Sequence, residues 1–304
     1  MWFKNLCPYR LLESFTLSPE ELDEKLAVQA FEPAGRADPS SRGWVSPMGS
    51  EGVQLVHAAN GVYMIALQEE SKLLPSSVVR ETLLERVAEL EEKEHRKIRK
   101  REKDQMKEDI TLELLPRAFS RNKVTYGYID TVEGWLVVDC ASWNQAEAFT
   151  EQLRDALGSL PIAPPSTEDS PQSVMTDWLA SERLPSDIEL GEEAVFEDPQ
   201  TEGCEIRCKR QDLHADEIKV HIKSGKRIRR LAVNWDQRMA CVLDSDYSVK
   251  KVKFSDVVSE SAGYEPETAA ERFDSDFSIM TLEFRRFLPR LMELFGGEAR
   301  EKIA

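Results

Sequence analysis

Residues 52–70 read GVQLVHAANGVYMIALQEE, two apolar runs joined by the dipeptide Asn60-Gly61. An Asn-Gly pair readily adopts the positive φ angles that a two-residue hairpin turn requires, so the stretch predicts two antiparallel strands. A second pair of apolar runs, VTYGYIDTVEGWLVVDCAS at 124–142, carries the weaker turn dipeptide Glu133-Gly134. It predicts another hairpin, and together the two indicate a sheet built from chain neighbours.

Helical patterns flank these hairpins. Ser18, Pro19 and Glu21 form an N-cap, a first-turn proline and a capping-box acid ahead of an amphipathic run. Residues 76–109 contain neither glycine nor proline and carry a narrow apolar stripe among dense charges, which predicts one long projecting helix or a helical pair. A further helix is expected at 142–158, where Gly158 would end it.

The segment PIAPPSTEDSPQS at 161–173 clusters proline, serine and acids, so we place a domain boundary near residue 170. The expected elements beyond it are a short helix at 174–185, strands near 203–213 and 229–254, and a helical region at 274–295 interrupted by Pro289. Helices and hairpins in this order predict an α+β fold.

The bulk composition limits the classes of partner. The chain has 304 residues, enough for about two domains. Its 56 acidic and 40 basic residues give a net charge of -16, which taken alone argues against a polyanionic partner. A nucleic-acid function must therefore depend on where the cations lie.

The sequence also indicates the compartment. No apolar run approaches the length of a membrane span, and the first residues lack the pattern of a signal peptide. The five cysteines are odd in number and lie mostly in apolar contexts, so we expect them to be reduced. These features predict a cytoplasmic protein without membrane contact.

Catalytic motifs are absent from the sequence. We find no Gly-rich phosphate loop, no G-x-S-x-G elbow and no H-E-x-x-H pattern. Cys204 and Cys208, followed by His214 and His221, lack the spacing of a common zinc module, and structural cysteines are the simpler interpretation. Acid pairs such as Asp244 and Asp246 favour turns or surface over a metal-dependent nuclease, which stays open as an alternative.

Basic residues gather in runs at 96–103, 207–210, 218–230 and 250–253. In so acidic a chain this segregation predicts a positive surface that faces a polyanion. The 218–230 run is the strongest candidate because it contains no acid, whereas the acids around 96–103 suit helical ion pairs. The candidate phosphate-binding residues are Arg96, Lys97, Arg99, Lys100, Lys209, Arg210, Lys219, Lys223, Lys226, Arg227, Arg229 and Arg230.

The stretch ELLPRAFSRNK at 113–123 follows the charged helical segment. Pro116 marks a helix exit, because proline has no N–H and clashes with the preceding turn. Phe119 then stands between Arg117 and Arg121. The residues alone leave open whether this ring is buried in a core or faces a partner.

Several segments resemble the RdgC family of bacterial recombination-associated proteins from residue 2 to about 299. They are WFKNLCPYRL at 2–11, GWVSPMGS at 43–50, LLPRAFSR at 114–121, DTVEGWLVVDCAS at 130–142, LGSLP at 157–161, KRQDL at 209–213, RFDSDF at 272–277 and GGEA at 296–299.

The resemblance implies a horseshoe-shaped subunit with three parts. These would be a central antiparallel or mixed sheet domain (1–72 and 116–170), a helical tip (73–115) and a base domain (171–304). Two subunits would meet at tips and bases to close a ring. The family's functional phenylalanine falls on Phe119, and a pair near the subunit contacts falls on Arg210-Gln211, with arginine where a relative has lysine.

The resemblance also implies sequence-independent binding of double- and single-stranded DNA and opposition to the RecA recombinase in replication and recombination, in the cytoplasm at the nucleoid. We therefore predict a homodimeric clamp without turnover, cofactor or metal, in which Arg117 and Arg121 flank a DNA-contacting Phe119. One alternative is a regulator that contacts the recombinase directly and uses DNA only incidentally. A metal-dependent nuclease is the other.

Overall fold

A computed structural model describes residues 2–201, 203–259 and 268–299. Within these residues the chain forms eight α-helices and two antiparallel sheets, which confirms the predicted α+β class. The helices are α1 (Pro19–Ala27), α2 (Ser76–Glu94), α3 (Lys100–Leu114), α4 (Trp143–Leu157), α5 (Pro171–Ser181), α6 (Asp216–Lys223), α7 (Asp256–Ser259) and α8 (Ala269–Leu294). Short 3-10 turns η1 (Gly49–Glu51) and η2 (Leu115–Arg117) supplement them.

The first sheet has the strand order β2-β4-β5-β6-β1-β7, with β3 also paired to β4. Its strands are β1 (Cys7–Leu11), β2 (Ser40–Val45), β3 (Val56–Ala59), β4 (Val62–Leu73), β5 (Phe119–Asp130), β6 (Trp135–Val138) and β7 (Ile162–Ala163). Both predicted hairpins are confirmed: Asn60 and Gly61 connect β3 to β4 with positive φ, and Gly134, also at positive φ, precedes β6.

The pair β4 and β5 forms the longest ladder, from Val62↔Asp130 to Leu73↔Phe119. Helices α1 and α4 pack on one face of its Asp130 end, and Tyr128 faces α8 on the other. Beyond the helices the pair continues as a narrow ribbon, in which β2 also pairs with β4 as far as Ser71, so β5 begins at Phe119, five residues before the expected strand at 124. Backbone pairing and polar contacts such as that from Lys72 Nζ to Ser120 Oγ sustain this extension, which is why apolar patterning did not predict it.

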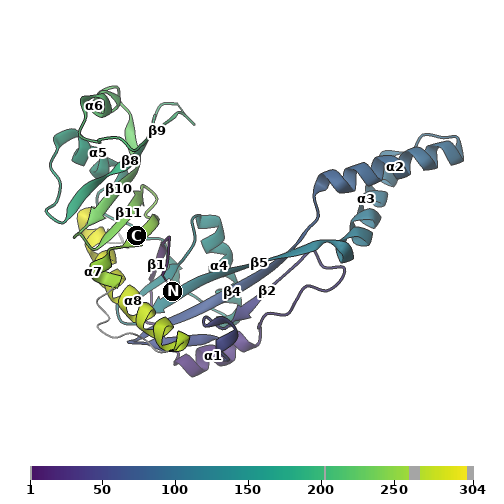
Figure 1. Ribbon diagram of the computed structural model, residues 1–304, viewed down its shortest axis with the longest axis horizontal. Coiled ribbons are helices and arrows are strands. Elements are labelled where there is room, and N and C mark those ends of the chain that lie inside the picture. The colour runs from purple at the N-terminus through teal and green to yellow at the C-terminus, as the bar shows by residue number, and fades with distance from the viewer. Residues whose placement is uncertain (1, 202, 260–267, 300–304) are drawn as a thin grey trace, which may run out of the picture.

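The ribbon carries the helical pair α2–α3, the second of the two forms expected for residues 76–109. His95, at φ 54, ends α2, and α3 ends at Leu114 just before Pro116, as predicted. Only a few apolar side chains are buried between the two helices, among them Val79, Val87 and Ile110. The pair projects far from the remaining chain (Figure 1), and we call it the arm.

The second sheet has the order β12-β11-β10-β8-β9 and is antiparallel throughout. Its strands are β8 (Ile188–Glu197), β9 (Glu205–Lys209), β10 (Arg227–Trp235), β11 (Met239–Asp244) and β12 (Val249–Phe254). One face packs on α5, α6 and α8. The opposite face, which we call the charged face, carries most of the cations discussed below.

Helix α8 corrects the prediction for the C-terminal region. It starts at Ala269 with a Thr268–Glu271 capping box and continues through Pro289 without interruption. Proline removes a single helical hydrogen bond, and the buried side chains on both sides of it, such as Phe284, Leu288 and Met292, hold the helix together.

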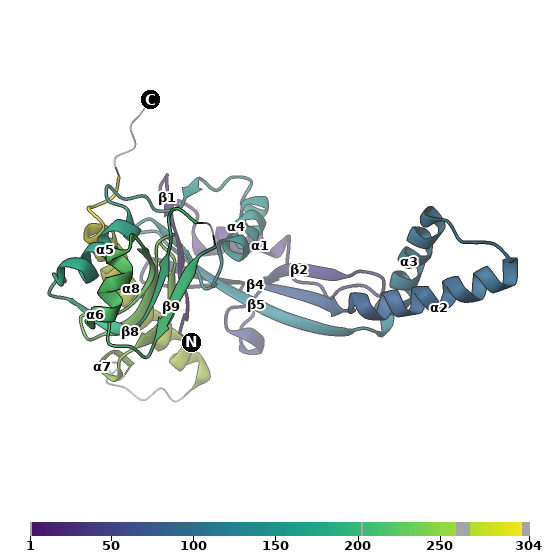
Figure 2. The same cartoon turned by 90° about the horizontal axis from the view of Figure 1, so that it is seen from above.

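A single apolar core joins α8 to both sheets, from Met64 and Tyr128 in the first to Leu231 and Leu243 in the second. The Arg285 guanidinium adds a buried ion pair to Asp130, with an Nε–Oδ2 distance of 2.6 Å. Figure 1 shows the result as an open arc, with the second sheet at one end and the arm at the other, and Figure 2 shows the same order of parts from above. The domain boundaries named above stay predictions.

Candidate nucleic-acid interface

The predicted site residues fall in three places: the outer end of the ribbon, the far end of the arm and the second sheet. Phe119 is the first residue of β5, and its side chain is 83% exposed. Its partner across the ladder, Leu73, is 50% exposed. A phenylalanine left in water costs free energy, and an exposed aromatic beside cations suits stacking on a nucleobase.

The cations around Phe119 are available. Arg117 in η2, and Arg121 and Lys123 in β5, are exposed, and among the described residues none of the three has an ion pair. Arg121 and Lys123 lie on the ribbon face of Phe119, since side chains two apart share a face. The acid opposite Lys123 is Glu69, which pairs with Arg42 at 3.4 Å (Nη2–Oε2). We call Arg117, Phe119, Arg121 and Lys123 the ribbon site; Lys123 was not among the predicted site residues.

At the far end of the arm, half of the predicted cations are paired. Arg96 contacts Glu94 and Glu102, and Lys97 contacts Glu91 with an Nζ–Oε2 distance of 2.7 Å. The hydrogen bond from Lys97 lowers the pKa of Glu91, so this acid stays charged. Arg99 and Lys100, at the start of α3, are exposed and have no ion pair within the described part of the chain.

On the second sheet and α6, acids distant in sequence neutralise many of the predicted cations. Lys219 pairs with Glu182 and Asp216, Lys226 with Asp198, and Arg229 with Glu197 and Glu205. Arg230 and Lys250 both pair with Asp244, and Arg207 pairs with Glu205. The expectation that the 218–230 run is free of neutralising acid is therefore wrong, because folding brings in carboxylates from other segments.

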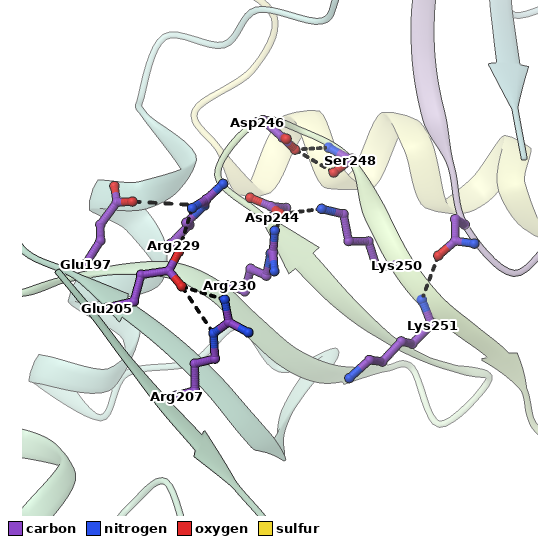
Figure 3. Close-up of polar contacts among 11 residues, drawn as sticks. Glu197, Glu205, Arg207, Arg229, Arg230, Asp244, Asp246, Ser248, Lys250 and Lys251 are labelled. Carbon is purple, nitrogen blue, oxygen red and sulfur yellow. Dashed lines mark hydrogen bonds and ion pairs between the residues drawn. The ribbon is translucent and has the colours of Figure 1, made fainter. Parts of the chain in front are cut away.

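A β-bulge places Arg229 and Arg230 together on the charged face. The β8–β10 register shifts between Ile228 and Arg230, so Arg229 is the additional residue. Ile228 and Leu231 on either side are fully buried, whereas the two arginines are half-buried. Bulges re-aim side chains in this way, and strict alternation would have placed one arginine against the core. Figure 3 shows both guanidinium groups among their acids.

Asp244 lies at the centre of this network and is 1% exposed. Its Oδ2 accepts from Arg230 Nε at 2.6 Å and from Lys250 Nζ at 2.7 Å (Figure 3). Burial alone would raise the pKa of Asp244, but the hydrogen bonds from Lys250 and Arg230 outweigh it and lower the pKa. A buried carboxylate with two cations is a structural ion pair that phosphate cannot readily displace.

The remaining predicted residues on and next to the second sheet are exposed: Lys209 in β9, Arg210 and Gln211 just after it, Lys223 at the end of α6 and Arg227 at the start of β10. Among the described residues, none of their charged side chains has an ion pair. Arg210 lies at φ 54, just beyond β9, which is an edge strand of its sheet. The Gln211 N–H donates to the Glu192 carbonyl at 3.3 Å. This corner combines free cations with an open sheet edge.

Figures 1 and 2 show where the second sheet lies relative to the ribbon and the arm. Helices α5 and α6 lie on the side of the second sheet that is away from the arm. The charged face is therefore turned toward the concave side of the arc, which the ribbon and the arm also border. The outer end of the ribbon, where β5 begins, and the second sheet therefore lie on opposite sides of one wide opening.

Metal-binding clusters and membrane-spanning helices are both absent from the described residues. In the described ranges, no three side chains of His, Cys, Asp or Glu are arranged to hold a metal ion. All five cysteines are free thiols. Each helix of the described residues is too short or too polar to cross a bilayer.

Comparison with known proteins places these features in a family. The family model described as "Putative exonuclease, RdgC" matches residues 1–298. Recombination-associated protein RdgC from Halorhodospira halophila is 54% identical over 299 residues, 98% of this chain and 99% of that protein. The proteins of the same name from Yersinia enterocolitica and Yersinia pestis are 43% and 42% identical over 301 residues, each match covering 99% of both chains.

Proposed function

Since the chain belongs to the RdgC family of recombination-associated proteins, we propose that it binds double- and single-stranded DNA without sequence preference and acts as a clamp. Two copies would join at the arms and at the second sheets, enclosing the duplex. DNA held in this way would be less accessible to a RecA-type recombinase. The protein would associate with the nucleoid through this binding.

The ribbon site is the observation that carries this proposal. It presents an 83% exposed phenylalanine and three cations with no ion pair among the described residues, in a chain of net charge -16. Exposed aromatics stack on bases of any sequence, and cations contact phosphates of any sequence. Together they support affinity without base-specific readout.

The arc supports the assignment of a clamp. Its concave side is bordered by the ribbon, the arm and the charged face of the second sheet (Figure 1). The acids of the remaining surface would repel DNA, so the duplex would be favoured only on this side. The predicted central, tip and base domains correspond in this proposal to the first sheet, the arm and the second sheet.

Salt dependence tests the binding mode. The affinity for a fluorescent 30-base-pair duplex should fall linearly on logarithmic axes as salt rises, because each phosphate contact releases counterions. An unrelated duplex of equal length should give the same curve. An affinity that did not change with salt would contradict phosphate binding, and a monomer in sedimentation at micromolar concentration would contradict the clamp.

The exonuclease in the family description is a second candidate function. It predicts that end-labelled DNA incubated with Mg²⁺ or Mn²⁺ is shortened, and that EDTA prevents this. DNA that stayed intact under conditions in which the protein is bound would favour the clamp.

Charge reversal in the ribbon site distinguishes inhibition by direct contact with the recombinase from inhibition by covering DNA. The double variant R117E/R121E should lose DNA binding while both side chains, being exposed, leave the fold intact. Inhibition of strand exchange that survived this loss would support the direct regulator.

A further inference from the structure

The charged face holds a pair of arginines whose phosphate-binding positions are occupied by an acid of the same chain. Glu205 and Arg207 are two residues apart on β9 and share a face. Arg229 reaches the same carboxylate from β10, across the intervening strand β8. Glu205 therefore bridges the two guanidinium groups, and Arg229 has a second, longer contact to Glu197 at 4.0 Å (Nε–Oε2) (Figure 3).

The contacts resemble those of a bound phosphate. Arg207 donates through Nη2 and Nε to Oε2 of Glu205, at 2.7 and 3.1 Å. Arg229 donates through Nη1 to the other oxygen, Oε1, at 2.8 Å. Two guanidinium groups converging on two oxygens of one anion is the arrangement that arginines also form with phosphate.

The ion pair between Glu205 and Arg207 is more exposed to solvent than the neighbouring ion pairs of Asp244. The side chains of Glu205 and Arg207 are 24% and 63% exposed, so water and ions reach the contact. Asp244, by contrast, is buried beneath Arg230 and Lys250. Exposed ion pairs are individually weak, and a DNA phosphate can therefore compete with Glu205, whereas Asp244 would not be displaced.

We propose that Glu205 is an internal competitor that occupies a DNA-phosphate subsite formed by Arg207 and Arg229. The hydrogen bond from Arg207 is the largest cause that lowers the pKa of Glu205, so the acid stays charged at neutral pH and competes throughout. The duplex gains these two contacts only when it displaces Glu205. The affinity of the charged face for DNA is thereby kept low.

The inference rests on the proposed DNA binding and concerns its regulation. Its test is the substitution Glu205→Gln, which keeps the shape but removes the competing charge. Glu192→Gln is the matched control, since Glu192 is an exposed residue of β8 with no ion pair among the described residues and gives the same change in net charge. Wild type and both variants would be titrated with a 30-base-pair fluorescent duplex at several salt concentrations.

We expect E205Q to bind the duplex about three- to tenfold more tightly at about 100 mM salt, with a salt slope steeper by about one unit per phosphate gained. E192Q should differ from wild type by less than about twofold. Adding Arg207→Gln to E205Q should abolish the gain, since the subsite then lacks one ligand. Thermal unfolding of each variant checks that β9 remains folded.

Each outcome decides something. Equal gains in E205Q and E192Q would mean that only net charge matters, and would overturn the inference. An unchanged or weaker affinity of E205Q would do the same, showing that Glu205 orients the arginines instead of competing. Wild-type protein that did not bind DNA at all would contradict the proposed function, separately from these results.

Discussion

The ribbon site and the charged face are both rich in cations, yet they differ in how much of that charge is available. Arg117, Arg121 and Lys123 on the ribbon have no ion pair among the described residues. On the charged face, Arg229 and Arg230 contact acids at 2.8 and 2.6 Å. A cation that already has a partner gains less from a phosphate, so under the proposed function we expect pairing, and not the number of basic residues, to decide which region contributes most to DNA affinity.

The largest expected effect is on the stability of the charged face. Asp244→Ala leaves Arg230 and Lys250 without their shared buried acid, and should lower the free energy of unfolding by about 2–4 kcal/mol. Urea denaturation measures this. E205Q is the control, because Glu205 is solvent-accessible and its removal should hardly move the midpoint. Equal urea midpoints for D244A and wild type would mean that the buried ion pairs of Asp244 stabilise the fold no more than the exposed ion pairs of Glu205.

Asp244 should also make the free energy of unfolding depend on pH. Because the folded-state pKa of Asp244 lies below the ordinary value of 3.8, its contribution to stability is present above that value and is lost as the pH falls through the folded-state pKa. Wild type should therefore lose stability below about pH 4 more steeply than Asp244→Asn, which cannot titrate at this position. Parallel curves of unfolding free energy against pH would contradict the assigned ion pair.

The second effect concerns DNA affinity. Neutralising the unpaired Arg117 and Arg121 together should weaken duplex binding about tenfold at about 100 mM salt and reduce the salt slope by about two units. Neutralising the paired Lys226 and Arg229 should weaken it less, by about two- to threefold. Fluorescence anisotropy across salt measures both. A larger loss from the paired residues would reverse the comparison between the two regions.

A smaller effect is expected at Phe119. Substitution by alanine should weaken single-stranded DNA binding about five- to tenfold, because one stacked base is lost, while the melting temperature stays unchanged. Leu73→Ala, at the paired position across the ribbon, is the control and should retain affinity. Loss of the dimer in sedimentation by F119A would instead assign Phe119 to a subunit contact.

The smallest effect is expected on the arm. Lys100→Gln removes a cation with no ion pair in the described residues and should weaken duplex binding about twofold, whereas Lys97→Gln removes one already paired with Glu91 and should change it less. Both variants carry the same net charge, so anisotropy at one salt concentration separates them. Identical duplex affinities of the two variants would mean that ion pairing does not affect how cations of the arm contribute to DNA binding.

Local elements of the fold were predictable. Three features have the expected form: the Asn60-Gly61 turn, the Ser18–Glu21 capping box and the helix end before Pro116. Each depends only on residues a few positions apart in the sequence. Pro289 was misjudged since the packing of Phe284 and Leu288 holds α8 together. The start of β5 at Phe119 was missed since backbone pairing, and not apolar alternation, sustains the ribbon there.

The sequence by itself determined the type of most elements, the prominence of Phe119 between two arginines and the presence of basic runs in an acidic chain. Only the tertiary structure decided which cations are free. Glu205 and Arg229 are 24 residues apart in the sequence and lie on strands separated by β8, yet they form an ion pair. Arg230 pairs with Asp244 on the neighbouring strand. Short-range preferences act between neighbours in the chain, whereas ion pairing follows distance in space, which exists only after the sheets have formed.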